Sequence, residues 1–229
     1  MFIQPLLQIT TTTVASTGTG KAEKTLSVLE LMIKGGWVMI PIGLLSLIAV
    51  YIIVERMLTL KKADKDPERF LENIKNLVYN GDISGAVQQC QQFDTPFSKM
   101  IEKGISKIGT PLPSIEASIE NVGKVEVYKL EKNLNILATI SGAGPMLGFF
   151  GTVLGLVQAF MAIAREDGSV SPKLLSTGMY EAMITTVGGL IVGIIAYVGY
   201  NYLVTKVDKI VHQMEYASIE FIELLQQPK

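Results

Sequence analysis

The stretch NLNILATISGAGPMLGFFGTVLGLVQAFMAIA, residues 133–164, decides the fold, because its thirty-two residues include no charged side chain. A helix rises about 1.5 Å per residue, so roughly 20 residues cross a hydrocarbon core of about 30 Å. Two other stretches have the same character: residues 35–54 carry no charge, and residues 174–205 carry only Glu181. The sequence therefore predicts an all-α integral membrane protein with three transmembrane helices.

The overall composition agrees with this class and leaves little material for catalysis. Apolar residues make up 48% of the 229 residues, the mean hydropathy is +0.37 and the formal net charge is −1. Cys90 is the only cysteine and His212 the only histidine, so Cys/His zinc sites and Ser-His or Cys-His catalytic groups have little to draw on. We expect no enzymatic activity, no cofactor, no metal site and no nucleic-acid partner.

The distribution of Lys and Arg predicts the orientation of the three spans. The segment between the first two spans carries twelve of them, whereas the next connection carries only Arg165 and Lys173. Basic residues near span ends mark the cytoplasmic side, so we expect a bacterial inner-membrane protein with a periplasmic N-terminus and a cytoplasmic C-terminus. The expected segments are a periplasmic N-terminal segment with an amphipathic helix (1–34), transmembrane helix 1 (35–56), a cytoplasmic helical loop (57–132), transmembrane helix 2 (133–164), a short periplasmic connection (165–177), transmembrane helix 3 (178–205) and a cytoplasmic C-terminal helix (206–229).

The cytoplasmic loop carries the start signals of short helices. Pro67 and Pro96 suit the first position of a helix, and Asp82 suits an N-cap. The second and third spans are expected to extend into long cytoplasmic helices that pack on each other, the second without a break. The evidence for that packing is a heptad-like apolar stripe after the third span: Val207, Val211, Met214, Ser218, Phe221 and Leu225. Independent amphipathic surface helices are the alternative.

Small residues recur at helical spacing in the second and third spans. They let helix backbones approach closely in lipid, where apolar surface alone gives no preference for protein over lipid. Ordinary helix packing explains most of them, and their density further suggests an assembly of many helices. The candidate packing positions are Gly144, Gly148, Gly151, Gly155, Gly188 and Gly189.

Glu181 is the one acid within the three apolar stretches, and a charge at the centre of a span costs roughly 2.5–3.5 kcal/mol on insertion scales. Such residues usually face a cavity or a partner. The alternative is an interfacial charge near a helix N-terminus, where the helix dipole favours anions. The residues alone favour neither explanation over the other.

Hydroxyl groups and one ion pair complete the set of candidate residues. Thr152, Thr185 and Thr186 lie deep in the second and third spans and are candidates for lining a lumen, with hydrogen bonding to their own helix as the alternative. Because a hydroxyl does not store charge near pH 7, a titratable group must act with them, either Glu181 or an acid on a partner. Glu55 and Arg56 close the first span, and we expect a snorkelled interfacial pair.

Two runs of sequence resemble the MotA/TolQ/ExbB proton-channel family, and its ExbB and TolQ branch in particular. These runs are GPMLGFFGTVLGL (144–156) and EAMITTVGGLIVG (181–193). The entry to the first span, KGGWVMIPIGLLS, and its exit, IVERM, also look like ExbB-type proteins. By this resemblance Thr152 and Thr186 correspond to lumen-facing threonines, and Glu181 corresponds to a glutamate near the lumen.

The resemblance further implies an assembly and a job. Such a subunit forms a homo-oligomer, five copies in the ExbB branch, around the single spans of an ExbD- or TolR-like partner whose aspartate takes up and releases the proton. The complex then drives a TonB- or TolA-like protein. The ion is expected to be H⁺, with Na⁺ as the alternative. The other functions considered are a TolQ-like, gliding or flagellar-type stator subunit and a non-conducting membrane scaffold.

Overall fold

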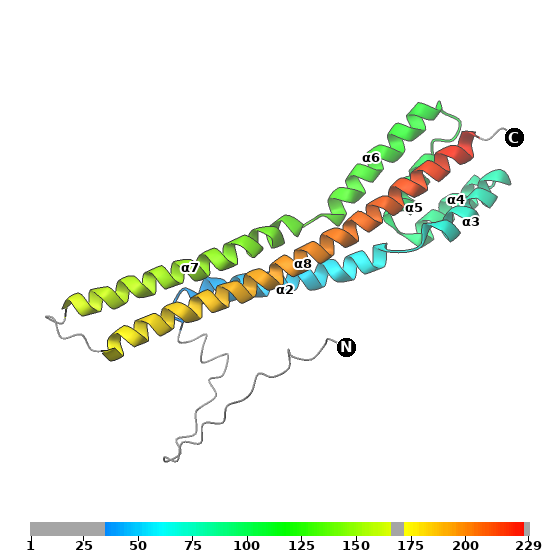
Figure 1. Ribbon diagram of the computed structural model, residues 1–229. Helices are drawn as coiled ribbons and strands as arrows, with labels where there is room; N and C mark the ends of the chain where they lie inside the picture. The colour runs from blue at the N-terminus through cyan, green and yellow to red at the C-terminus, as the bar shows by residue number, and fades with distance from the viewer. Residues whose placement is uncertain (1–34, 166–171, 227–229) are drawn as a thin grey trace, which may run out of the picture.

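A computed structural model describes residues 35–165 and 172–226 of the chain. Over these ranges the protein is helical, with three long helices side by side and a group of shorter helices at one end (Figure 1). The predicted amphipathic helix within residues 1–34 lies outside the described residues.

The three long helices are α2 (Met39–Ala63), α7 (Leu134–Arg165) and α8 (Pro172–Gln226). Each contains a window long and apolar enough to cross a membrane. Much of their apolar surface is exposed, for example at Ile40, Leu47, Phe149 and Ile194. Contiguous exposed apolar surface of this extent marks contact with lipid or with other chains.

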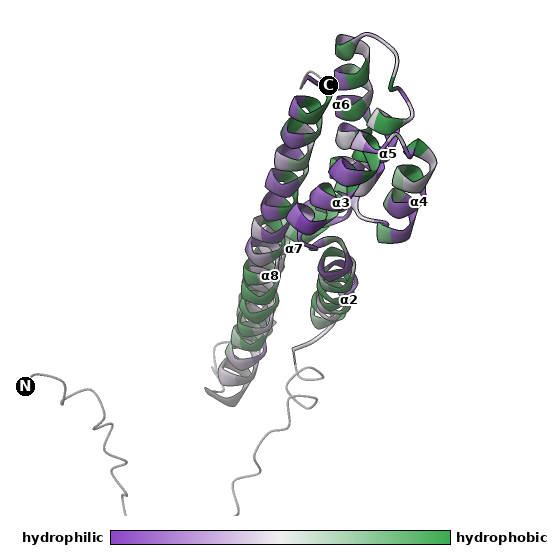
Figure 2. Ribbon diagram, turned by 90° about the vertical axis from the view of Figure 1, so that its right-hand side faces the viewer, coloured by the Kyte–Doolittle hydropathy of each residue, from purple (hydrophilic) through white to green (hydrophobic). Residues whose placement is uncertain are grey.

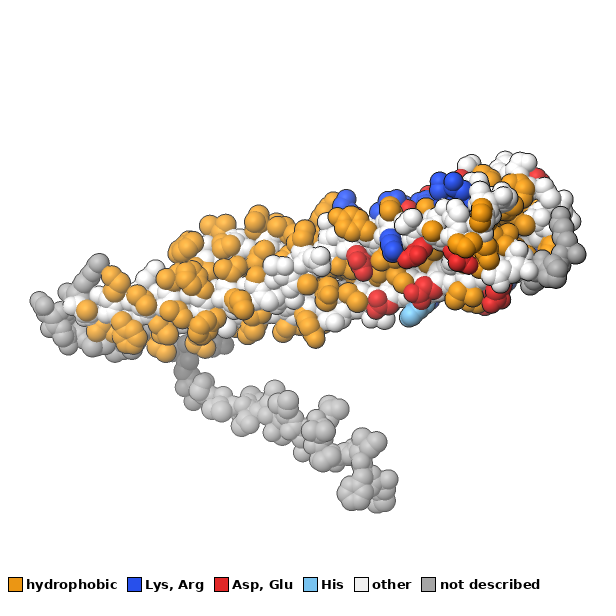
Figure 3. Space-filling view, turned by 90° about the horizontal axis from the view of Figure 1, so that it is seen from above, with side chains coloured by type: hydrophobic (Ala, Val, Ile, Leu, Met, Phe, Trp, Pro, Cys, Tyr) orange, Lys and Arg blue, Asp and Glu red, His pale blue; other side chains and the backbone are white. Residues whose placement is uncertain are grey.

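The surface divides into an apolar half and a charged half. Hydrophobic side chains cover the long-helix end of the molecule in Figure 3, and Lys, Arg, Asp and Glu gather over the other end. Figure 2 shows the same change along α8, from hydrophobic to hydrophilic toward the C-terminal end. This division matches the predicted all-α membrane fold with a helical domain outside the bilayer.

The helices begin or end at other residues than the expected segments in two places. The connection expected over residues 165–177 is shorter, because α8 already begins at Pro172 and runs to Gln226 without interruption. Proline is favoured at the first helical position, where its missing N–H is not needed. The second long helix is interrupted: residues 131–133 separate α6 (Leu112–Leu130) from α7, and Asn133 takes a left-handed conformation with φ +66°. Asn tolerates this conformation better than most residues.

The short helices begin where the sequence predicts. They are α3 (Pro67–Tyr79), α4 (Ile83–Phe93) and α5 (Pro96–Ile105). Asp66 caps α3, and Asp82 caps α4 by accepting from the Gly85 N–H at 2.9 Å. These helices enclose an aromatic cluster of Phe70, Phe93 and Phe97, with ring centroids 4.9–5.9 Å apart. Cys90 is buried among them.

The C-terminal half of α8 supplies the apolar stripe that holds this domain. The period of the predicted stripe is correct, but its alternate positions are displaced by one residue. The buried residues are Val207, Ile210, Met214, Ala217, Phe221 and Leu224, while Val211 and Leu225 are only partly buried. Steps of three and four residues keep one face of α8 against α3, α5 and α6.

Candidate ion-pathway site

Glycines of α7 bring its backbone against α8. A methyl group built on Gly148 would lie 3.0 Å from Thr185 O and 3.0 Å from Thr186 Cα. One built on Gly144 would lie 3.0 Å from Gly189 O, and one on Gly155 would lie 2.8 Å from Ala182 Cβ. Ordinary Cβ contacts begin near 3.4 Å, so a side chain at any of these three positions would force the two helices apart.

Of the remaining candidate glycines, two lie in the contact between α7 and α8 and one lies in the contact between α8 and α2. Gly151 of α7 is packed on the Thr185 side chain, and Gly189 of α8 is packed on the Gly148 backbone. Gly188 faces the other way, toward Met39 and Ile42 of α2. Packing within one chain therefore uses these small residues, and they do not by themselves require neighbouring chains.

Two threonine hydroxyls of α8 lie within hydrogen-bond distance of one backbone carbonyl of α7. Thr186 Oγ1 donates to Gly148 O at 3.0 Å, and Thr185 Oγ1 lies 3.5 Å from the same oxygen. Thr185 is buried and also donates to Ala182 O of its own helix at 2.7 Å. The absence of a side chain on Gly148 allows the two helices to lie close here, so the structure brings Thr185, Thr186 and Gly148 together.

Thr152 is not part of that group. Its Oγ1 donates to Phe149 O of its own helix at 2.6 Å. This is the back-bonding that threonines in apolar helices commonly make. Its side chain is only half-buried, whereas that of Thr185 is buried.

Glu181 lies one helical turn before Thr185, but its contact is with a different element. It is the tenth residue of α8, and its half-buried carboxylate rests against Gly36, just before α2 begins. The structure therefore links the acid to the start of the first apolar helix and the threonines to α7. Sequence reasoning missed Gly36, because nothing local in the GGW run relates it to a residue 145 positions away.

Glu55 and Arg56 form a pair of a different kind from the expected snorkelled one. Arg56 Nε and Nη2 donate to the two carboxylate oxygens of Glu55 at 2.9 and 2.6 Å. Arg56 is 4% exposed, and its Nη1 donates to Lys129 O at 3.1 Å. The last carbonyls of a helix lack partners within that helix, so Arg56 supplies one to α6. Arg56 thus ties the end of α2 to the α6–α7 junction instead of reaching for water.

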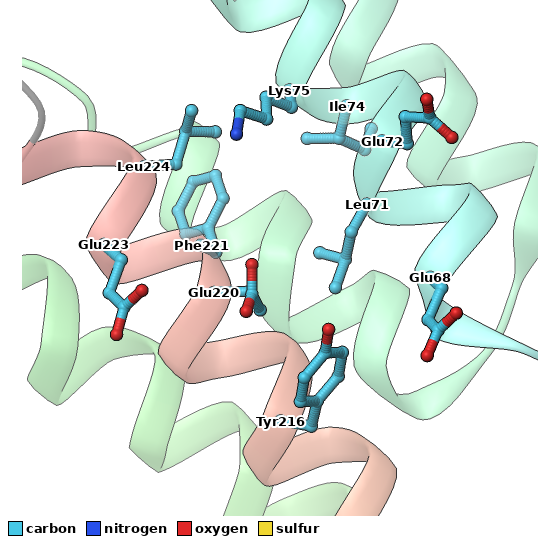
Figure 4. Close-up of a pocket in the computed structure, with 10 residues that line it drawn as sticks. All are labelled: Glu68, Leu71, Glu72, Ile74, Lys75, Tyr216, Glu220, Phe221, Glu223 and Leu224. Atoms are coloured by element: carbon cyan, nitrogen blue, oxygen red, sulfur yellow. The ribbon is translucent and has the colours of Figure 1, made fainter.

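Several cavities lie in the short-helix domain and at its border with the long helices. One of them, shown in Figure 4, lies between α3 and α8 in the short-helix domain. Its floor is apolar and its rim carries Glu68, Glu72, Glu220 and Glu223 with Lys75. Among the described residues no group of three or more His, Cys, Asp or Glu is placed to hold a metal ion. The α7–α8 contact with Glu181 remains the candidate site.

Comparison with known proteins assigns this arrangement to a family. The profile of the MotA/TolQ/ExbB proton channel family matches residues 92–216, more than half of the chain. The matched range includes α5, α6, α7 and most of α8, with Gly148, Thr185 and Glu181. The chain belongs to the MotA/TolQ/ExbB family. It is therefore a multi-pass membrane protein of a proton-channel family, which is not a family of enzymes.

Individual relatives point to the ExbB and TolQ branch. The putative biopolymer transport protein ExbB homolog of Methanothermobacter thermautotrophicus is 29% identical over 82% of this chain and 67% of its own length. The biopolymer transport protein ExbB of Neisseria meningitidis serogroup A is 25% identical over 70% of this chain and 77% of its own. The Tol-Pal system protein TolQ of Haemophilus influenzae is 36% identical, but over only 37% of either chain.

Proposed function

We propose that this chain is an ExbB-type subunit of a motor in the bacterial inner membrane, driven by the proton-motive force. The observation that carries the proposal is the α7–α8 contact. There the hydroxyls of Thr185 and Thr186 both lie within hydrogen-bond distance of Gly148 O, one helical turn after Glu181 on α8. Each proton crossing 100 mV releases about 2.3 kcal/mol, so a few protons suffice to drive a mechanical step.

The working channel is a ring of these chains around a partner. The three apolar stretches of the sequence hold a single acid, Glu181, and hydroxyls do not hold charge near pH 7, so we expect a second titratable group to come from a partner. We propose a homo-oligomer, a pentamer, whose lumen holds the single spans of an ExbD- or TolR-like protein. That complex energises a TonB- or TolA-like protein. The names of the ExbB and TolQ relatives support this choice of branch.

The proposed orientation places the short-helix domain in the cytoplasm. The basic residues of the 57–132 segment support a cytoplasmic position for it. The N-terminus and the connection between α7 and α8 then face the periplasm. Glu181, near the start of α8, lies toward the periplasmic end of the path.

The test is ion flux in liposomes that hold the chain together with its single-span partner. We expect Glu181→Ala and Thr186→Val to assemble normally and to lose flux. The matched control is Thr139→Val: Thr139 lies on α7, the helix that Thr186 contacts, but its side chain is exposed and donates to Asn135 O of its own helix. Replacing H⁺ gradients by Na⁺ gradients decides the ion. Full flux in both site variants would refute the roles assigned to these residues.

A non-conducting scaffold is the competing function, with Glu181 anchoring a partner. In that case the complex forms, but flux does not exceed that of empty liposomes. A TolQ-like, gliding or flagellar-type stator would conduct equally well, and the identity of the co-purifying partner distinguishes these motors.

A further inference from the structure

Gly36 is the residue against which the Glu181 carboxylate rests. A methyl group built on Gly36 would overlap Oε1 of Glu181 and lie 3.4 Å from Cδ and 3.9 Å from Cγ. The carboxylate thus occupies the space that a side chain at position 36 would need. Glu181 lies on α8, so this contact connects the acid of the third span to the entry of the first.

The backbone of Gly36 also has a conformation that favours glycine. Its φ is +69°, in the left-handed region. Gly81 and Gly109 have similar values of +76° and +97°, but a methyl group on either would meet nothing within 4 Å. Of the three described glycines with positive φ, Gly36 alone is limited both by its backbone and by a neighbouring side chain.

The start of α2 offers a suitable environment for an anion. The N-terminus of a helix carries a partial positive charge, although the first N–H groups of α2 are already paired: Met39 N–H donates to Gly36 O at 3.2 Å and Ile40 N–H donates to Trp37 O at 3.1 Å. The N-cap, Val38, makes no side-chain hydrogen bond to the helix, and the first turn of α2 contains no acid. Among the described residues, Glu181 is the acid found against this end of α2.

We propose that Gly36 is a positioning residue for Glu181. Its missing side chain and left-handed backbone form the recess that holds the carboxylate between α8 and the start of α2. The inference deepens the proposed function, because it makes the first span part of the mechanism although its own apolar stretch has no acid. A shift of α2 relative to α8 would then move the acid, and a change at the acid would be felt by α2.

The test compares one substitution in two backgrounds, in the full chain assembled with its partner. Gly36→Ala is made in the wild type and together with Glu181→Asp. An aspartate carboxyl carbon would occupy the place of Glu181 Cγ, 3.9 Å from the new methyl group, which is ordinary contact distance. Backbone strain from Gly36→Ala is the same in both backgrounds, whereas the overlap with the carboxylate exists in only one.

The first readout is the rate at which dicyclohexylcarbodiimide labels the acid at position 181, resolved by peptide mass spectrometry. We expect Gly36→Ala to push the Glu181 carboxyl out of its recess and to raise its labelling rate by about two- to fivefold, the scale of one helix-terminus interaction. In the Glu181→Asp background we expect Gly36→Ala to have no effect. Equal changes in both backgrounds would show strain alone and overturn the proposal, as would no change in either.

The second readout is ion flux of the same complexes. We expect Gly36→Ala to lower flux in the wild type, and to leave the flux of the Glu181→Asp complex at the level of that single variant. Unchanged flux despite faster labelling would overturn the claim that the recess matters for conduction. If the wild-type complex conducts nothing, the proposed function fails, and the labelling comparison still decides whether Gly36 positions Glu181.

Discussion

Substituting Gly148 by alanine tests the packing that builds the site. The new methyl group would lie 3.0 Å from Thr185 O, 3.0 Å from Thr186 Cα and 3.2 Å from Thr186 O. Ordinary contacts begin near 3.4 Å, and all three atoms belong to the backbone or the Cα of α8, so no flexible side chain is able to move aside. The helices must separate by several tenths of an ångström over this contact.

The expected cost is that of overpacking a well-packed contact, about 1–3 kcal/mol. The separation also lengthens the hydrogen bond from Thr186 to Gly148 O, now 3.0 Å. The matched control is Gly142→Ala, on the same helix, where a methyl group meets nothing within 4 Å. Alanine is the better helix former by about 1 kcal/mol, so Gly142→Ala is expected to leave stability unchanged or raised.

The assay is equilibrium unfolding in detergent micelles by titration with sodium dodecyl sulfate, followed by circular dichroism. We expect Gly148→Ala to unfold at a lower denaturant fraction than both the wild type and Gly142→Ala. Equal stability of Gly148→Ala and Gly142→Ala would refute the close approach of α7 and α8 at this position.

Three further predictions concern the domain outside the bilayer. Burial raises the pKa of the Cys90 thiol to about 12, so at pH 8 about one thiol in ten thousand is ionised. Iodoacetamide should therefore label Cys90 only after the protein unfolds, and rapid labelling of the folded protein would contradict this burial. The Lys209 ammonium, 2.8 Å from Asp64, holds the pKa of that carboxyl below its ordinary 3.8, so the pair stabilises the fold above about pH 4 and this contribution is lost as the pH falls through the lowered pKa. Asp64→Asn should therefore lower the free energy of unfolding by up to about 1 kcal/mol at pH 7. A stability difference between Asp64→Asn and the wild type that persists undiminished in acid would contradict the role of the pair. Because φ is +66° at Asn133, Asn133→Gly should keep or raise the stability of the protein, and Asn133→Val should lower it by about 1–3 kcal/mol. Thermal unfolding of the two variants measures this difference. Equal melting temperatures of the two variants would indicate that the helix is unbroken at this position.

The features of the fold that were predictable from sequence are those set by composition over many residues. Three apolar stretches are long enough to cross a bilayer, and the number of spans does not depend on how the helices pack. Pro67, Asp82 and Pro96 mark helix starts because the first turn of a helix has local requirements. The interruption at Asn133 was not predictable, since the flanking residues read as continuous helix and the break is held by Arg56 of another helix.

The sequence selects the candidate residues by their type and position, but it does not show which of them are in contact. The apolar stripe on α8 shows the same limit: Ile210 and Val211 are equally apolar, and only the position of the partner helices decides which is buried. Likewise the sequence picks out Glu181 by its rarity, but the recess at Gly36 depends on the placement of α2. The hydroxyl of Thr152 was grouped with those of Thr185 and Thr186, whereas in the chain it bonds to its own helix.

The most direct test of the proposed function is proton uptake by liposomes that contain the chain with its single-span partner. A potassium gradient and valinomycin impose the membrane potential, and a pH-sensitive dye inside the liposomes reports the protons that enter. We predict acidification with the complete complex, and none with either protein alone or with Glu181→Ala. Acidification that is unchanged in Glu181→Ala, or absent from the complete complex, would contradict a proton path past the α7–α8 contact.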